Sequence, residues 1–125
     1  MDREGQAPSG WLVQRAYPCW WSRGVDHVRG GFHESLRLDG EPSGETRRAR
    51  LYPRQIYAFS VATELGWSGP AADAVRQGVK ALLADYRRPD GLYRGLVAPS
   101  GAALIERAVL YDQAFVLLGF AGAHK

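Results

Sequence analysis

The stretch RARLYPRQIYAFSVATELG, residues 48–66, decides the fold because it is typical of a helix that other helices enclose. Proline is favoured in the first turn of a helix and glycine just past its end, so Pro53 and Gly66 predict a helix over residues 53–65. A helix that is apolar on nearly every side is normally buried in a larger assembly. The apolar side chains form two stripes: Tyr52, Ile56 and Phe59, and Tyr57, Ala58, Val61 and Leu65.

Arg54 is the unexpected residue in this stretch, because it lies on the second apolar stripe in the first turn. A cation there opposes the positive end of the helix dipole. Departures of this kind concentrate at functional sites, which makes Arg54 a candidate functional residue. The simpler alternative is that Arg54 pairs with an acid or extends its charged end to the surface.

Three further helices are predicted. Residues 9–23 have one apolar face and a kink expected at Pro18. A second one-faced helix starts at Pro70 and stops at Pro89, with Val75, Val79, Leu82 and Tyr86 as its apolar stripe. A third, over residues 110–123, is apolar on nearly every side like residues 53–65. Glycine turns at Gly40 and Gly101 predict short β-hairpins between the helices.

The chain also has an internal repeat. RARLY at residues 48–52 matches RAVLY at residues 107–111, an offset of 59 residues, and each follows an extended run with a glycine turn. We therefore predict one domain over residues 1–125, built from two units at about 9–66 and 68–125. Repeats of this length indicate stacked units that cannot bury their apolar faces alone.

Alternating one-faced and all-round apolar helices predict an inner ring of helices coated by an outer ring, an α/α barrel. The fold class is thus all-α, with about four helices and short β-hairpins between them. A ring of roughly six such units needs on the order of 350 residues. We therefore expect this chain to be an N-terminal fragment. Whether the chain end at Lys125 is natural stays open.

Composition limits the partners. The net charge is +3, and the 14 arginines are spread along the chain, so we expect no nucleic-acid partner. Cys19 is the single cysteine, so no intrachain disulfide is expected. No CxxC motif and no pair of histidines has the spacing of metal ligands, so no metal site is expected. Without a leader or a membrane-spanning run, the chain is expected to be cytoplasmic with no membrane partner. Its oligomeric state, including a homo-oligomer, stays open.

Several short motifs together resemble the N-terminal third of the N-acylglucosamine 2-epimerase family, which also contains mannose isomerases and cellobiose 2-epimerases. The motifs are AYPCW (16–20), GVD (24–26), RGGF (29–32) with Glu34, DG (39–40), RQ (54–55) with FS (59–60), and LYDQAF (110–115). The resemblance implies an (α/α)6 barrel. It also implies C2 epimerisation or aldose–ketose isomerisation of a mono- or disaccharide through a cis-enediolate, without a cofactor.

The resemblance implies specific residue roles. Arg54 sits where the family uses an arginine to hold sugar oxygens, and a cation there can stabilise the negative charge of an enediolate. Tyr111 matches a tyrosine at the barrel mouth, although packing against Tyr52 is an equally simple role. Gln113 stands where many members have histidine. The family's catalytic histidines have no match here, because His27 and His33 are expected to be surface or packing residues and His124 lies in the tail. No catalytic residue is therefore expected in this chain, and substrate-binding roles fall to Arg54 and Tyr111.

Two other functions compete with this interpretation. Four acids could supply the paired carboxylates of a glycoside hydrolase, although solvated loops explain them more simply. A non-enzymatic helical fragment could bind a partner through its exposed inner helices. Tryptophans could stack on sugars, but Trp11 and Trp20 are expected in the core. The acids are Asp26, Glu34, Asp39 and Glu106. Which sugar is used, and whether C2 is inverted or the carbonyl moved, stays open.

Overall fold

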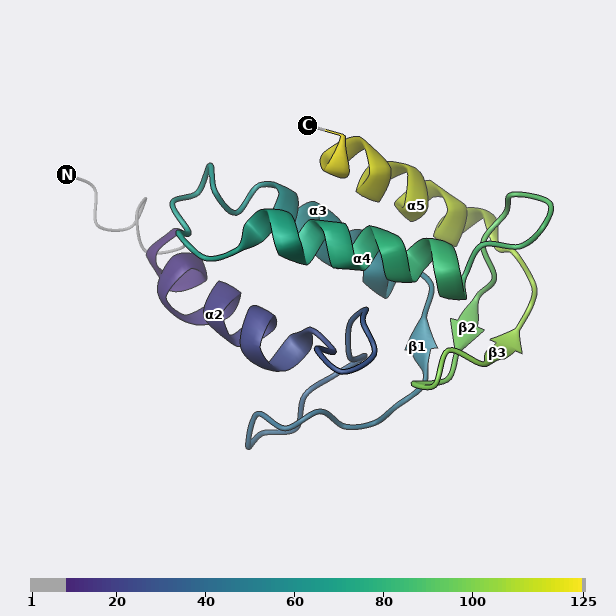
Figure 1. Cartoon of the computed structure of the whole chain (residues 1–125), viewed down its shortest axis with the longest axis horizontal. Helices are drawn as coiled ribbons and strands as arrows, with labels where there is room; N and C mark the ends of the chain where they lie inside the picture. Colours follow the sequence, from purple (N-terminus) through teal and green to yellow (C-terminus); the bar gives the residue numbers. More distant parts are fainter. Residues whose placement is uncertain (1–8, 125) are drawn as a thin grey trace.

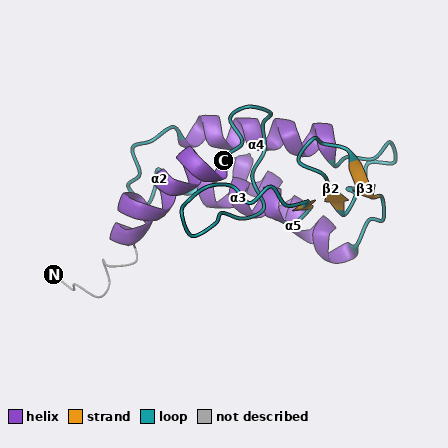
Figure 2. Ribbon diagram, turned by 90° about the horizontal axis from the view of Figure 1, so that it is seen from below, coloured by secondary structure: helices purple, strands orange, loops and turns teal. Residues whose placement is uncertain are grey.

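The computed structural model describes residues 9–124, so Lys125 and residues 1–8, on which the expectation of no leader mainly depends, lie outside the described residues. Within this range four helical segments surround a common core, with a small sheet at one end (Figures 1 and 2). The first helical segment contains η1 (Leu12–Ala16), α2 (Tyr17–Cys19) and η2 (Trp20–Gly24). The others are α3 (Leu51–Ser60), α4 (Ala71–Asp85) and α5 (Leu110–Ala123), and the strands are β1 (Arg47–Arg48), β2 (Leu96–Val97) and β3 (Ala103–Ile105).

The first helical segment forms where it was predicted, with wide π-helical turns on both sides of Pro18. Proline has no N–H to donate, which weakens the regular ladder around it. Tyr17 sets the buried face, since its hydroxyl donates a 2.7 Å hydrogen bond to the carbonyl of Ala58. Trp20 is half-buried, but Trp11 is 59% exposed, so the prediction that Trp11 packs in the core is wrong.

Helix α3 begins two residues before Pro53 and ends at Ser60, earlier than predicted. The early start costs nothing, because no N–H in the first turn of a helix has an intrahelical acceptor. At the other end, the N–H of Ala62 bonds to the carbonyl of Phe59, three residues back. This tighter turn starts an irregular stretch that reaches Gly66, which has a φ of 105°.

Only one of the two predicted stripes of α3 is buried. Tyr52 and Ile56 are fully buried and Phe59 nearly so, whereas Tyr57 and Leu65 are 37% and 38% exposed. The buried stripe joins an aromatic core in which Phe59 contacts Tyr17, Phe32 and Trp67 at ring-centroid distances of 5.8, 6.2 and 5.7 Å. This stripe is thus the core-facing side of α3, while α5 packs on another side of the helix through Gly119 and Gly122.

Helix α4 packs on α3 through small side chains (Figure 1). Its predicted stripe is only partly correct, since Leu82 is fully buried while Val75 and Val79 are half-buried. The closest approach is at Gly78, where an added Cβ would lie 2.8 Å from Ile56. The periodicity of the large apolar residues predicted that the valines face the core. The buried face instead carries alanine and glycine, whose small size lets the two helices approach closely.

The predicted hairpins form in part. Strands β2 and β3 make an antiparallel hairpin around Gly101, whereas residues 25–42 make only the isolated bridges Val25–Phe32 and Leu36–Pro42. Strand β1, which precedes α3, pairs with β2 and gives the strand order β1-β2-β3. The sheet therefore joins segments from the two predicted units.

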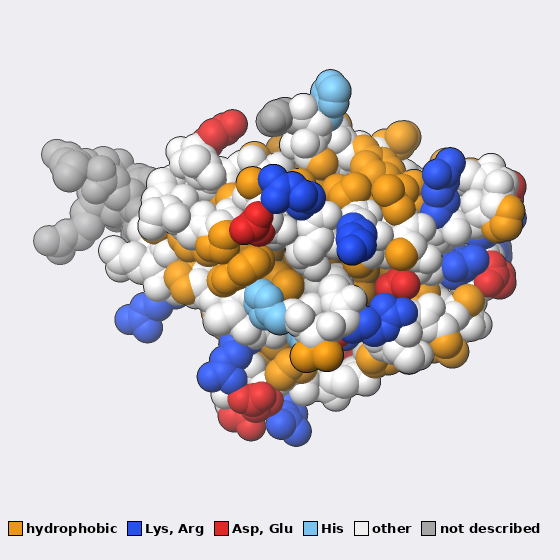
Figure 3. All heavy atoms as spheres, viewed as in Figure 1, with side chains coloured by type: hydrophobic (Ala, Val, Ile, Leu, Met, Phe, Trp, Pro, Cys, Tyr) orange, Lys and Arg blue, Asp and Glu red, His pale blue; other side chains and the backbone are white. Residues whose placement is uncertain are grey.

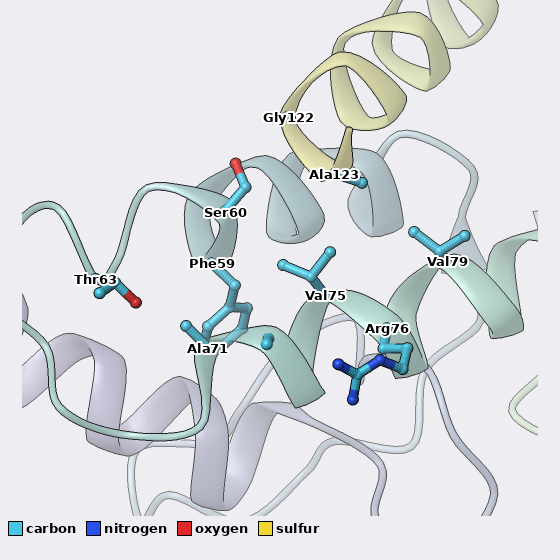
Figure 4. A pocket seen from close by; sticks show the side chains of 10 residues that line it. Phe59, Ser60, Thr63, Ala71, Val75, Arg76, Val79, Gly122 and Ala123 are labelled. Atoms are coloured by element: carbon cyan, nitrogen blue, oxygen red, sulfur yellow. The ribbon is translucent and has the colours of Figure 1, made fainter. Parts of the chain in front are cut away.

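One side of α5 is open. Leu110, Leu117 and Leu118 are 84%, 71% and 41% exposed, and hydrophobic side chains gather over this helix in Figure 3. Beside it lies a groove of about 470 Å³ between the end of α5 and the start of α4, lined by Phe59, Val75 and Val79 among others (Figure 4). No helix within residues 9–124 is both long enough and apolar enough to cross a membrane.

Candidate functional site

Four arginines surround the start of α3, and only one of them lacks a carboxylate partner within residues 9–124. This residue is Arg54, which is exposed. Because the first turn of α3 contains no acidic residue, the positive end of the helix dipole adds to its charge. The three paired arginines are Arg47 with Asp26 at 2.8 Å, Arg50 with Asp112 at 3.3 Å, and Arg48 with Glu34.

The side chain of Arg54 lies against α5. Its guanidinium carbon is 5.8 Å from the centroid of the Phe115 ring, within the range of a cation–π contact. The acid-pairing alternative has no support among the described residues. The exposure of Arg54 agrees with a side chain that extends to the surface. It agrees equally well with a side chain in an open ligand-binding site.

Tyr111 lies in the same seam between α3 and α5. The guanidinium carbon of Arg50 is 4.8 Å from the centroid of its ring, and Phe115 meets it edge-to-face at 5.0 Å. Tyr111 therefore packs against Arg50 and Phe115. The alternative role, packing against Tyr52, is wrong, because the aromatic neighbours of Tyr52 are Phe32 and Tyr86. Tyr111 is 55% exposed.

Sequence reasoning selected Arg54 and Tyr111 as candidates, and the structure brings both to this seam; it did not select Arg50, Asp112 or Phe115. Residues four apart lie on one face of a helix, so Arg50 and Arg54 form one row on α3, and Tyr111 and Phe115 another on α5. The two rows alternate cation and aromatic ring across the seam. Each apolar helix begins with two such residues four positions apart, two arginines in one and two aromatic residues in the other. This shared spacing could have predicted that the two rows meet.

Gln113 has a structural role. Its side-chain oxygen accepts a 2.9 Å hydrogen bond from the N–H of Tyr93, and its side-chain nitrogen donates a 2.8 Å bond to the carbonyl of Tyr93. Both ends of the amide are therefore occupied by the backbone. The same nitrogen also donates a 3.2 Å hydrogen bond to the carbonyl of Val109, so Gln113 joins two backbone segments.

Each of the four candidate carboxylates is bound by a different arginine. Asp26 is buried and the Glu34 side chain is only 8% exposed, so the expectation of solvated acids is wrong for these two residues. Burial raises the pKa of Asp26, but hydrogen bonds from Arg47 and the backbone N–H of Arg29 outweigh burial and leave the pKa below its usual value. The other pairs are Glu34 with Arg48, Asp39 with Arg37 at 3.7 Å, and Glu106 with Arg94 at 3.3 Å.

The histidines are packing or surface groups, as expected. His27 is exposed, and a ring nitrogen lies 2.6 Å from the carbonyl of Trp21. His33 is half-buried beside Arg47; burial and the charge of Arg47 both lower its pKa. Within residues 9–124 no cluster of three or more His, Cys, Asp or Glu side chains could hold a metal ion.

Comparison with known proteins identifies the family of this chain. Residues 30–125 match the family model of N-acylglucosamine 2-epimerase (GlcNAc 2-epimerase). A mannose-6-phosphate isomerase of Rhizobium meliloti (strain 1021) is 39% identical over 113 residues, which are 90% of this chain and 29% of that protein. This chain therefore spans about three-tenths of the length of the curated relative.

Solved structures agree on the fold. A cellobiose 2-epimerase from Spirochaeta thermophila DSM 6192 matches 98% of this chain with a TM-score of 0.83 and 23% identity. A D-mannose isomerase matches 98% with a TM-score of 0.85 and 22% identity. In each case the match covers 31% of the longer chain. The chain belongs to the N-acylglucosamine 2-epimerase family.

Proposed function

We propose that this chain forms part of a sugar 2-epimerase or aldose–ketose isomerase, and that Arg54 and Tyr111 contact the sugar. The observation that carries the proposal is the Arg54 guanidinium, which has no carboxylate partner within residues 9–124 and lies against Phe115, the neighbour of Tyr111, in a chain of this family. The names of the relatives support aldoses of the mannose or cellobiose type as the substrate class.

The reaction begins with removal of the proton at C2, next to the sugar carbonyl. The electron pair moves to the carbonyl oxygen and gives an enediolate. Return of a proton to the opposite face of C2 inverts that carbon, whereas delivery to C1 moves the carbonyl to C2. In both cases the negative oxygen needs a fixed donor, and the guanidinium of Arg54 supplies one near the positive end of α3.

The proton-transferring groups of this proposal lie outside residues 9–124. His27 and His33 belong to the turn and extended segment before β1, and neither contacts the Arg54–Phe115 seam in the described residues. Acid–base catalysis requires a titratable group within hydrogen-bond reach of the reacting proton. The chain alone is therefore expected to be inactive.

We further propose that the described helices are one sector of an (α/α)6 barrel made of repeated 59-residue units. Leu51 and Leu110, which are 59 residues apart, are the first residues of α3 and α5. The exposed leucines of α5 support this arrangement, because neighbouring helices of a barrel would cover them. The same exposed leucines favour the second candidate, a helical module that binds a protein partner.

The test uses the purified chain with D-mannose, N-acetylglucosamine and cellobiose in D2O. Proton NMR should record no exchange at C2, while the backbone amide signal of Phe115, whose ring lies against Arg54, should shift with added sugar in the 15N-labelled chain. The shift should vanish in Arg54→Ala and persist in Arg76→Ala, since Arg76 pairs with Asp73 on the exposed side of α4. Turnover that survives Arg54→Ala, or a sugar response equal in both variants, would contradict the proposal.

A further inference from the structure

Asp112 is a buried carboxylate that the proposed function does not use. Its side chain is 4% exposed and lies 3.3 Å from the Nε of Arg50. A buried carboxylate requires a compensating positive charge, and Arg50 supplies one from the opposite helix. Neither Arg50 Nε nor Asp112 Oδ1 has an aligned hydrogen bond within the described residues, so their contact is an electrostatic one.

Arg50 in turn limits the position of Tyr111. A guanidinium is planar and rigid, so the attraction of Asp112 for its Nε edge limits where that plane can lie over the Tyr111 ring. That plane lies against the ring, with 4.8 Å between Cζ and the ring centroid, and Phe115 restricts the ring edge at 5.0 Å. Without these neighbours, a side chain that is 55% exposed at the start of a helix would be free to change rotamer.

We infer that Asp112 and Arg50 act in series as positioning residues that orient Tyr111 toward the Arg54 side of the seam. Asp112 holds Arg50, and Arg50 holds the ring. The inference rests on the proposed function only for what Tyr111 contacts, since the orientation of the ring is a property of the sugar-free chain. A plain latch between α3 and α5 is the competing role for the same pair.

The experiment follows the Tyr111 signal in the fluorine NMR spectrum of the chain labelled with 3-fluorotyrosine, assigned with Tyr111→Phe. Arg50→Gln and Asp112→Asn should each move this signal, and the double variant should move it no further than Arg50→Gln alone. Arg50→Lys keeps the charge but not the planar fork, so it should not restore the native signal. Arg94→Gln, which breaks a pair with Glu106, serves as the matched control and should leave the signal unchanged.

Thermal unfolding of the same variants separates the two roles. A latch would lower the unfolding midpoint in every variant while the Tyr111 signal stayed in place. An unchanged signal in Arg50→Gln, or additive shifts in the double variant, would overturn the inference. Both readouts come from the folded chain, so a variant that loses its fold is replaced by Arg50→Met, which keeps the packing of the side-chain stem.

A sugar titration then tests the link to function. If Tyr111 contacts the sugar, D-mannose should move its signal in the native chain. In Arg50→Gln about tenfold more sugar should be needed for the same effect, which corresponds to about 1.4 kcal/mol. Absence of any sugar effect on the native chain would contradict the proposed function alone, because the sugar-free series has already decided the positioning role.

Discussion

Arg47 is the residue on which the polar core depends. Its guanidinium bonds to Asp26 at 2.8 Å, to the Tyr52 hydroxyl at 3.1 Å and to a ring nitrogen of His33 at 3.1 Å. These bonds fasten the turn at residues 26–31 to the strand that leads into α3. Breaking a buried ion pair is far more costly than breaking an exposed one. The polar core therefore fixes where α3 begins, and with it the position of Arg54.

His33 makes this core sensitive to pH. The ring nitrogen that faces Arg47 must act as an acceptor, so protonation there removes a hydrogen bond and places two cations together. The unfolded chain takes up this proton below about pH 6.5, while the folded chain resists it because its pKa is lowered. Unfolding free energy should therefore fall as the pH drops from 7.5 to 5.5, and urea unfolding measures it.

The matched variants are His33→Gln and His27→Gln. A glutamine at position 33 offers an acceptor that does not titrate, so the dependence on pH should flatten. His27 is exposed, and its replacement should preserve the slope of the native chain. Equal slopes for the native chain and His33→Gln would show that His33 does not carry this effect.

At the scale of the helices, glycine controls how α3 and α5 approach each other. An added Cβ at Gly119 would lie 2.8 Å from the Cα of Pro53, an atom that cannot move without the backbone. Gly119→Ala should thus destabilise the chain by about 1–3 kcal/mol, although alanine favours helices. Gly10 is also helical but has open space around its Cβ position, so Gly10→Ala should be neutral or stabilising. Denaturant unfolding compares the two, and equal effects would contradict the close contact.

The helices could be predicted from the sequence more reliably than their faces. Pro53 and Pro70 placed the starts of two helices to within two residues, because proline constrains the backbone locally. The buried face of α4 was missed because Ala74, Gly78 and Ala81 carry little hydrophobic signal. Motifs selected Arg54 and Tyr111 as candidates, whereas the Asp112–Arg50 pair required the crossing of two helices to be known.

At the scale of the whole molecule, α5 separates a covered face from an open one. Val116 is 3% exposed and its neighbour Leu117 is 71% exposed. Leu117→Gln should change the free energy of unfolding by less than about 0.5 kcal/mol, whereas Val116→Gln should lower it by more than about 2 kcal/mol. Urea unfolding distinguishes them. A similar loss for both variants would mean that Leu117 is covered in solution.

The pairing of β1 with β2 has a consequence for assembly. Two residues before α3 bond to two residues that follow α4, so the ladder closes only after both halves of the sequence have been synthesised. The β2–β3 hairpin is local in sequence and can form without β1, but it then exposes an unsatisfied edge that β1 must cover. Peptides divided at the loop between Ser60 and Ala71 should each stay largely disordered, and they should regain helicity only when mixed.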